Sequence, residues 1–327
     1  MYEKIEETSK KFVKTDFPLN IAIEPSNHCT LNCICCAHSQ MTRKKGTVSI
    51  KLYKKIIDEI ASESPYSRVW LDYYGEPLLQ KFKLYYLIDY AKKKGLKNVC
   101  LNSNATLLNE DMTDMLLDSG IDFISFDCDG FSSEVYEKIR VNAKRDVVYH
   151  NIEYFLERKK EYEKEILANG DKKKTPIVEV KIMEMDENKD EIDMVMSYWR
   201  KRGAWTTKRR LISWGGKIKN IKYEEQKDRY PCGHALGVMA ITWEGKVVNC
   251  VMDVDAKFVC GDANTESLKD IWQRHNKNLV DLHLNRDWER LPEICKNCSD
   301  WKIIGEERYD ENGIRILKNY NSKEKML

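Results

Sequence analysis

Four cysteines stand close together near the start of the chain, in the segment Cys29-Thr-Leu-Asn-Cys33-Ile-Cys35-Cys36. Cys29, Cys33 and Cys36 form the pattern C-x3-C-x2-C. Three thiolates at this spacing can bind three irons of a cubane [4Fe–4S] cluster and leave the fourth iron without a protein ligand. An open iron offers a place for a substrate or cofactor to bind, whereas a fully ligated cluster mostly carries electrons or supports structure. A plain zinc knuckle is the alternative that the spacing leaves open.

The composition narrows the class of protein. The chain has 327 residues, 42% of them apolar, and a net charge of +2, so nothing points to nucleic acid or an anionic membrane as a partner. No stretch is long and apolar enough to span a bilayer, and the charged start is unlike a signal peptide. We therefore expect a cytoplasmic protein, in which eleven cysteines, an odd number, favour metal ligation over a disulfide framework.

Strand and helix patterns alternate about six times between residues 21 and 214. This alternation predicts right-handed βαβ units and a parallel sheet, hence an α/β fold. The candidate chemical residues follow strands directly, and ligands in such folds bind at the carboxyl ends of the strands. The expected strands are 21–24, 68–72, 98–102, 122–126, 177–183 and 210–214, and the expected helices are 49–61, 82–94, 109–119, 133–140, 150–166 and 190–202.

The pattern changes at about residue 223, where helical alternation stops and Cys, Gly and Trp become dense. Residues 240–250 predict a β-hairpin with its turn at Glu244-Gly245, and 268–278 predict a helix. We expect a lead-in over 1–20, a first domain over 21–222 and a smaller, cysteine-rich second domain over 223–327.

Between about residues 20 and 220 the chain resembles the radical S-adenosylmethionine (radical SAM) enzymes. The resemblance rests on the cysteine loop, on Tyr74-Gly75-Glu76-Pro77, on Ser103-Asn104-Ala105-Thr106-Leu107-Leu108 and on Asp127-Cys128-Asp129-Gly130 before a helix. It implies a partial (β/α)6 TIM-like barrel, a [4Fe–4S] cluster on Cys29, Cys33 and Cys36, and SAM. It also implies SAM contacts from Tyr74, Gly75, Glu76, Ser103 and Asn104. Tyr74 replaces the usual first glycine, so Gly75 and Glu76 carry the assignment.

Cys35 departs from the aromatic residue or Met that is usual in that family before the third ligand. It is either a residue that packs on the adenine of SAM or an alternative ligand. Cys100 lies in an apolar strand and is interpreted as a core residue. Cys128 falls at a strand end, and strand alternation leaves its direction open.

The C-terminal cysteines resemble the twitch form of the SPASM appendage. The resemblance implies one auxiliary [4Fe–4S] cluster on Cys232, Cys250, Cys295 and Cys298, because no cysteine follows in the last 29 residues. A structural zinc site is the alternative for these four. Cys260 is interpreted as a packing residue, with a thiol hydrogen-atom donor or a swapped ligand as alternatives.

The resemblance extends to aminocyclitol- and carbohydrate-acting dehydrogenases of this group. It implies that a 5′-deoxyadenosyl radical removes a carbinol hydrogen, a base takes the hydroxyl proton and the auxiliary cluster accepts the remaining electron. Asp127, Arg209 and Arg210 are positional candidates for catalytic residues, and a flavodoxin or ferredoxin is the implied electron donor. The alternatives are a peptide-modifying radical SAM enzyme and, from another class, an iron–sulfur or zinc protein that catalyses nothing.

Overall fold

A nine-stranded mixed sheet forms the centre of the computed structural model, which describes residues 15–171, 173–219, 221, 229–248 and 250–302. The sheet has the order β6-β5-β4-β3-β2-β1-β7-β8-β9. Neighbouring strands from β6 to β7 are parallel, and β8 and β9 are antiparallel to their neighbours. The strands are β1 (Asn20–Ile23), β2 (Arg68–Trp70), β3 (Asn98–Ser103), β4 (Phe123–Asp127), β5 (Ile177–Glu184), β6 (Trp205–Arg210), β7 (Val238–Ile241), β8 (Lys246–Val248) and β9 (Val259–Asp262).

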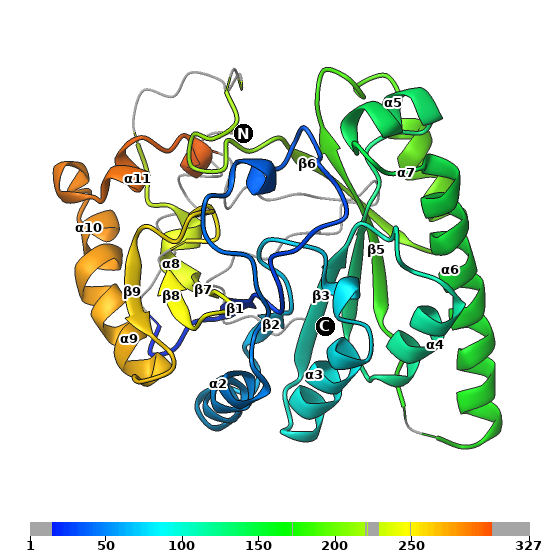
Figure 1. Cartoon of the computed structure of the whole chain (residues 1–327), viewed down its shortest axis with the longest axis horizontal. Coiled ribbons are helices and arrows are strands. Elements are labelled where there is room, and N and C mark those ends of the chain that lie inside the picture. The colour runs from blue at the N-terminus through cyan, green and yellow to red at the C-terminus, as the bar shows by residue number, and fades with distance from the viewer. Residues whose placement is uncertain (1–14, 172, 220, 222–228, 249, 303–327) are drawn as a thin grey trace.

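Helices cover the outer face of the parallel strands, as in a partial TIM barrel (Figure 1). Figure 1 also shows α9 and α10 at the opposite end of the sheet from α6 and α7. The α-helices are α2 (Ile50–Glu63), α3 (Phe82–Lys93), α4 (Glu110–Asp118), α5 (Ser133–Ile139), α6 (Arg145–Ala168), α7 (Ile192–Arg200), α8 (Gly233–Gly237), α9 (Leu268–His275), α10 (Asp281–Leu284) and α11 (Glu293–Lys296). Short 3₁₀ or π segments are η1 (Ala37–Gln40), η2 (Pro77–Gln80), η3 (Asn276–Val280), η4 (Trp288–Arg290) and η5 (Asp300–Lys302).

Side-chain alternation gives the parallel strands an apolar outer face and a polar inner face. Val69, Leu71, Leu101 and Phe126 are fully buried and belong to the core that packs against the helices. Local caps fix the helix starts. The Ser49 side chain accepts a hydrogen bond from the Leu52 N–H, and Asn109 and Ser132 cap α4 and α5 in the same way.

The C-terminal region continues the same sheet. Strand β7 pairs in parallel with β1 over four residues, from Asn20 opposite Val238 to Ile23 opposite Ile241. The expected hairpin is confirmed, because β7 and β8 are antiparallel and Gly245 donates its N–H to the Thr242 carbonyl. Gly245 has φ +98°, which explains the glycine at this turn. A division at residue 223 remains our proposal.

Three elements differ from the sequence-based expectation. The sixth strand spans Trp205–Arg210, so the expected strand over 210–214 is wrong. The sequence of β6 is polar and the strand lies at the edge of the sheet, so it lacks the apolar pattern that predicts a strand. The apolar residues that suggested a strand follow β6 in the sequence. Helix α6 begins five residues earlier than expected, and β9 was not expected at all.

Within the described ranges, none of the helices combines the length and the apolar character that crossing a membrane requires. All eleven cysteines carry free thiols.

Candidate active site and cysteine clusters

The N-terminal cysteine loop follows β1 and is held by the turn after β2. The Glu76 N–H donates to the His28 carbonyl at 2.7 Å, directly before Cys29. Gly75 has φ +113°, and a Cβ there would lie 2.4 Å from the Ser26 carbonyl oxygen. Only glycine permits this close approach of the two backbone segments. The turn therefore fixes the start of the cysteine loop.

Polar groups from other elements contact the loop's thiols. The Asn104 side chain lies with Nδ2 3.9 Å from Cys29 Sγ, and Arg140 Nη1 lies 3.8 Å from Cys33 Sγ. Cys36 caps η1 by accepting a hydrogen bond from the His38 N–H at 3.4 Å. The Leu31 N–H also donates to Cys29 Sγ. Each of the three predicted ligands therefore has a side-chain or backbone N–H group beside its sulfur.

Burial and mutual repulsion disfavour thiolates at this loop in the absence of a cation. Burial raises the pKa of Cys29 to about 11 and that of Cys36 to about 12, and Cys36 also senses the charges of Cys29 and Cys33. A hydrogen bond from Cys35, followed by the charge of Arg140, lowers the pKa of Cys33. Three half-buried cysteines whose sulfurs interact with one another fit ligation of a cationic group, which removes this penalty. Among the described residues, no three His, Cys, Asp or Glu side chains are arranged to hold a single metal ion.

The predicted SAM-binding segments meet at the Glu76 carboxylate. Its Oε1 accepts hydrogen bonds from the Leu78 N–H and the Ser103 hydroxyl, and its Oε2 accepts one from the Asn104 N–H, all at 2.9 Å. Glu76 is buried, and burial raises its pKa to about 7 against the opposing effect of these bonds. The structure thereby brings Gly75, Glu76, Ser103 and Asn104 together beside Cys29.

Tyr74 and Cys35 occupy supporting positions. The Tyr74 ring packs against Tyr73 and Trp214 at centroid distances of 4.8 and 5.5 Å, and the Trp214 indole donates to the Cys35 carbonyl at 2.8 Å. Cys35 is buried beside Ile139, with its Sγ 4.0 Å from Asp129 Oδ2. Contact of either residue with SAM stays a prediction.

Asp127 lies at the end of β4 within a network of charges. Lys181 Nζ lies 3.0 Å from Asp127 Oδ1 and donates to Asn102 Oδ1 at 2.7 Å. Arg140 Nη1 lies 3.4 Å from Asp127 Oδ2. Burial acts to raise the pKa of Asp127, but Lys181 and Arg140 outweigh it and the net shift is downward. Arg140 therefore connects this network to Cys33.

Two further carboxylates on this face are also held in place. Asp129 accepts hydrogen bonds from Arg140 Nε at 2.6 Å and from the Met183 N–H at 2.7 Å. Glu179 accepts hydrogen bonds from Ser125 and Thr207 at 2.6 and 2.7 Å, and Arg209 Nη2 lies 3.8 Å from its Oε1. Arg210 ends β6 and is half-buried. Arg209 is thus part of the network.

Asp72 is an acid of this region that the sequence-based reasoning did not single out. It follows Trp70 by two residues, so alternation places it on the inner face with Asn102, Asp127 and Lys181. The side chain is half-buried. The pKa of Asp72 is raised to about 7, mainly by burial. The charges of Asp127 and Glu76 add to this rise, and the charge of Lys181 opposes it. The alternation of side chains along β2 is the sequence signal from which the position of Asp72 on the inner face could have been predicted.

The four C-terminal cysteines come from separate segments and converge. Cys232 precedes α8, Cys250 follows β8, and Cys295 and Cys298 lie in and after α11. Cys232 and Cys295 pack against the same apolar cluster. Burial raises the pKa of Cys250, and the charges of the other three cysteines raise it further. The backbone N–H groups of Met252 and Asp300 donate to Cys250 Sγ and Cys298 Sγ at 3.4 and 3.3 Å. This donor set fits an iron–sulfur cluster or zinc equally in its chemistry.

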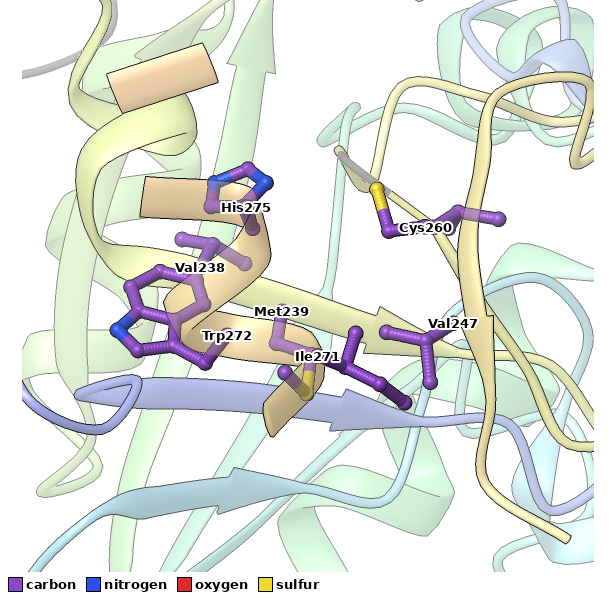
Figure 2. Close-up of a pocket in the computed structure, with 8 residues that line it drawn as sticks. Val238, Met239, Val247, Cys260, Ile271, Trp272 and His275 are labelled. Carbon is purple, nitrogen blue, oxygen red and sulfur yellow. The ribbon is translucent and has the colours of Figure 1, made fainter. Parts of the chain in front are cut away.

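Of the remaining cysteines, Cys100 and Cys128 lie apart from these sets, whereas Cys260 is close enough to Cys295 for its charge to raise the pKa of Cys295. Cys128 is fully buried, and its thiol faces Tyr149 and Trp199 on the helix side of β4, which answers the open question of its direction. Cys100 is buried, as expected of a core residue. Cys260 lies at the edge of an apolar recess between the β7–β9 strands and α9, beside Ile271 and opposite Trp272 (Figure 2). That recess does not accommodate a water molecule.

The two cysteine sites are joined by one segment that follows Cys250. Arg43, in the N-terminal loop, donates from Nε to the Val254 carbonyl at 2.7 Å and forms a buried ion pair with Glu24. Thr42 donates its N–H to Asp255 Oδ1 at 2.7 Å, and the Tyr73 hydroxyl donates to the Asp253 carbonyl. Residues 253–255 therefore pack directly against the loop that carries the first site.

Comparison with known proteins places this arrangement in a family. Residues 23–168 match the radical SAM superfamily, and residues 232–299 match the SPASM iron–sulfur cluster-binding domain. The chain belongs to the radical SAM superfamily and carries a C-terminal SPASM domain. Its cofactors are accordingly SAM with a [4Fe–4S] cluster, and auxiliary iron–sulfur ligation in the SPASM domain.

Among curated proteins, the chain is 24% identical to S-adenosyl-L-methionine-dependent 2-deoxy-scyllo-inosamine dehydrogenase of Niallia circulans, over 89% of this chain and 96% of that protein. It is 30% identical to the AdoMet-dependent heme synthase of Methanosarcina barkeri, over 38% of this chain and 35% of that protein. Similar solved structures are BtrN in complex with AdoMet and 2-DOIA (TM-score 0.59, 18% identity, 88% of this chain and 94% of that chain) and anSMEcpe with bound AdoMet and a Cp18Cys peptide (TM-score 0.60, 15% identity, 88% and 87%). These structural likenesses establish the fold.

Proposed function

We propose that this protein is a radical SAM oxidoreductase that dehydrogenates an alcohol carbon of a small polar substrate of the sugar or aminocyclitol class. The observation that carries the proposal is the inner face of the sheet beside Cys33, where Asp127 with Lys181 and Glu179 with Arg209 form paired charges. A polyhydroxylated ligand requires such a set of fixed donors and acceptors. The full-length match to an aminocyclitol dehydrogenase supports the same substrate class.

In this proposal the residues have distinct roles. Cys29, Cys33 and Cys36 hold a [4Fe–4S] cluster, and Gly75, Glu76, Ser103 and Asn104 form the adjoining wall that receives SAM. The bound cofactor pair supplies a 5′-deoxyadenosyl radical that takes a hydrogen atom from an unactivated carbon. The Arg209 guanidinium is a planar donor of several N–H groups and is suited to orient a hydroxyl or phosphate-like oxygen. Asp127, whose pKa is lowered by its cationic neighbours, is a weak base and is suited to hold Lys181 and Arg140 in place.

The SPASM cysteines and the cellular setting complete the proposal. Cys232, Cys250, Cys295 and Cys298 would hold one auxiliary [4Fe–4S] cluster, which would supply an acceptor for the electron left on the substrate carbon. A flavodoxin or ferredoxin delivers the electron that starts the reaction, because radical SAM clusters work at low potential. Eleven free thiols favour a reducing compartment, the cytoplasm.

The test is anoxic reconstitution followed by incubation with SAM, a reductant and substrates deuterated at the carbinol carbons. We expect deuterium in 5′-deoxyadenosine and a ketone product with at least one sugar or aminocyclitol. Short peptides provide the matched comparison. Modification of peptides, with no cyclitol or sugar product, would contradict the proposal and favour the peptide-modifying alternative. Absence of SAM cleavage under strong reduction would favour a non-catalytic protein.

A further inference from the structure

The acids at the carboxyl ends of the strands differ in how they are held. Glu76, Asp127, Asp129 and Glu179 each accept hydrogen bonds or ion pairs at the distances given above. Glu24, at the end of β1, is paired with Arg43. In the part of the chain that the structure describes, the Asp72 carboxylate has no hydrogen bond and no ion pair. It alone of these acids keeps its oxygen lone pairs available.

Asp72 also lies where a proton acceptor for the proposed reaction is required. The Leu71 N–H donates to the Cys100 carbonyl, which extends the pairing of β2 with β3 and places Asp72 beside Asn102. Asn102 contacts Asp127, and Asp127 contacts the same Arg140 that lies against Cys33 Sγ. A continuous set of contacts therefore links the face that carries Asp72 to the first cysteine site.

The charged groups around Asp72 suit proton uptake and release. Lys181 from β5 favours its charged form, whereas Asp127 from β4 and Glu76 from the turn after β2 oppose it. Cys100, its neighbour on β3, is buried with a raised pKa, and the cation of Arg68 stacks over Trp70 on the same strand. The half-buried carboxyl accordingly changes protonation near pH 7, where a general base is most effective.

We propose that Asp72 is the general base that takes the substrate's hydroxyl proton; the inference rests on the proposed function. In this step the substrate carbon has already lost a hydrogen atom to the 5′-deoxyadenosyl radical. The substrate O–H bond breaks and its proton forms an O–H bond with an Asp72 carboxylate oxygen. One electron leaves the carbon for an acceptor of the iron–sulfur class, and the C–O bond becomes C=O. The proton then passes to solvent, which the half-exposed side chain reaches.

The experiment compares reconstituted wild type with Asp72→Asn, Asp72→Glu and the exposed control Asp111→Asn on α4, using a deuterated cyclitol or sugar that the wild type oxidises. In Asp72→Asn we expect deuterium still to reach 5′-deoxyadenosine, while ketone formed per 5′-deoxyadenosine falls about 100-fold. Asp72→Glu restores part of the ketone yield, and Asp111→Asn equals wild type. An unchanged ketone ratio in Asp72→Asn would overturn the assignment.

A second measurement is independent of turnover. Infrared difference spectra of the protein without SAM or substrate, recorded from pH 5 to 9, should contain a carboxylate signal near pH 7 to which Asp72 and Glu76 both contribute, and the amplitude of this signal should fall in Asp72→Asn. Equal thermal unfolding of the two proteins shows that the variant is folded. If the wild type oxidises no alcohol, the proposed function itself fails. If it does and the amplitude of the titrating signal is the same in Asp72→Asn as in the wild type, only the assignment of the base fails.

Discussion

The two cysteine sites of this protein are built in opposite ways. The N-terminal site takes three thiols from eight consecutive residues, and its surroundings come from strand ends and from Arg140 on the α5 side. The C-terminal site takes four thiols from three segments between Cys232 and Cys298, which are joined by short helices and loops. Local spacing thus defines the first site, whereas tertiary packing must bring the second together. At the first site, the fold must position the residues that surround the thiols. At the second site, the fold must bring the thiols themselves together.

The largest effect is expected when the three cysteines of the N-terminal site are replaced, which tests whether the two sites assemble independently. In the variant Cys29→Ala/Cys33→Ala/Cys36→Ala we expect iron to fall from about eight to about four atoms per chain and SAM cleavage to disappear. The second site, whose ligands lie elsewhere, keeps its iron. Iron, sulfide and zinc analysis after anoxic reconstitution measures the first quantity, and 5′-deoxyadenosine release the second. Loss of all iron would show that the sites do not assemble independently.

Removal of one ligand of the second site should produce the reverse result. In Cys250→Ala we expect about four irons and continued SAM cleavage, with the ketone product lost because no electron acceptor remains. Cys100→Ala, which removes a thiol from neither site, serves as the matched control. About four irons and one zinc in the wild type would instead make the C-terminal set a structural zinc site. Redox-neutral chemistry would then replace dehydrogenation as the better proposal.

The connection between the sites can be tested at Arg43. Its guanidinium pairs with Glu24, whose side chain is fully buried, and also contacts the Val254 carbonyl. Arg43→Met leaves that carboxylate without its partner, and we expect a loss of about 3–5 kcal/mol in the free energy of unfolding. Lys217→Met, which breaks a more exposed pair with Asp255, should cost less than about 1 kcal/mol. Denaturant unfolding measures both, and equal losses would refute the contrast.

The smallest expected effect is a difference in pH dependence between the two regions. The folded-state pKa of Asp72 is raised from 3.8 to about 7, so its contribution to stability is lost as the pH rises through that interval. The pKa of His275, in the C-terminal region, is lowered from 6.5 to about 4, mainly by burial, so its contribution is lost as the pH falls through that interval.

Melting temperatures recorded from pH 4 to 8 compare these contributions. Asp72→Asn should flatten the decline toward high pH, and His275→Gln should flatten the decline toward low pH. Asp72→Asn should leave the decline toward low pH as it is in the wild type, and His275→Gln should leave the decline toward high pH unchanged. Parallel curves for wild type and both variants would show that neither group titrates as described.

The sequence predicted the barrel strands and helices where periodicity was strong. Five of the six strands and the starts of α2, α4 and α5 were expected from alternation and helical spacing, and in the structure Ser49 and Asn109 cap α2 and α4. Strand β6 was misplaced because Trp205-Thr-Thr-Lys-Arg-Arg is polar and gains its order from pairing with β5. Strand β9 was missed because it is short and its side chains are partly exposed.

The candidate site was predicted in its motifs but not in its supporting residues. The family resemblance indicated that the cysteine loop, the segment around Glu76 and the segment around Asn104 lie close together. Asp72 belongs to no motif, and Arg140 was noted only as the end of the helix that follows Asp129-Gly130. The roles of both residues depend on which strand ends and helix termini the fold places together. Pairing of Asp127 with Lys181 likewise joins β4 to β5 at a register that no local pattern encodes.

The pairing of β7 with β1 has a consequence for the order of synthesis. Strand β1 is the earliest strand among the residues that the structure describes, yet one of its two neighbours is complete only when residue 241 has left the ribosome. Until then β1 exposes a row of unsatisfied backbone groups along one edge, directly before the cysteine loop. A nascent chain that stalls or is cut between the two domains is therefore expected to offer that edge to chaperones or to other chains. The iron–sulfur loop becomes shielded only after the C-terminal half arrives.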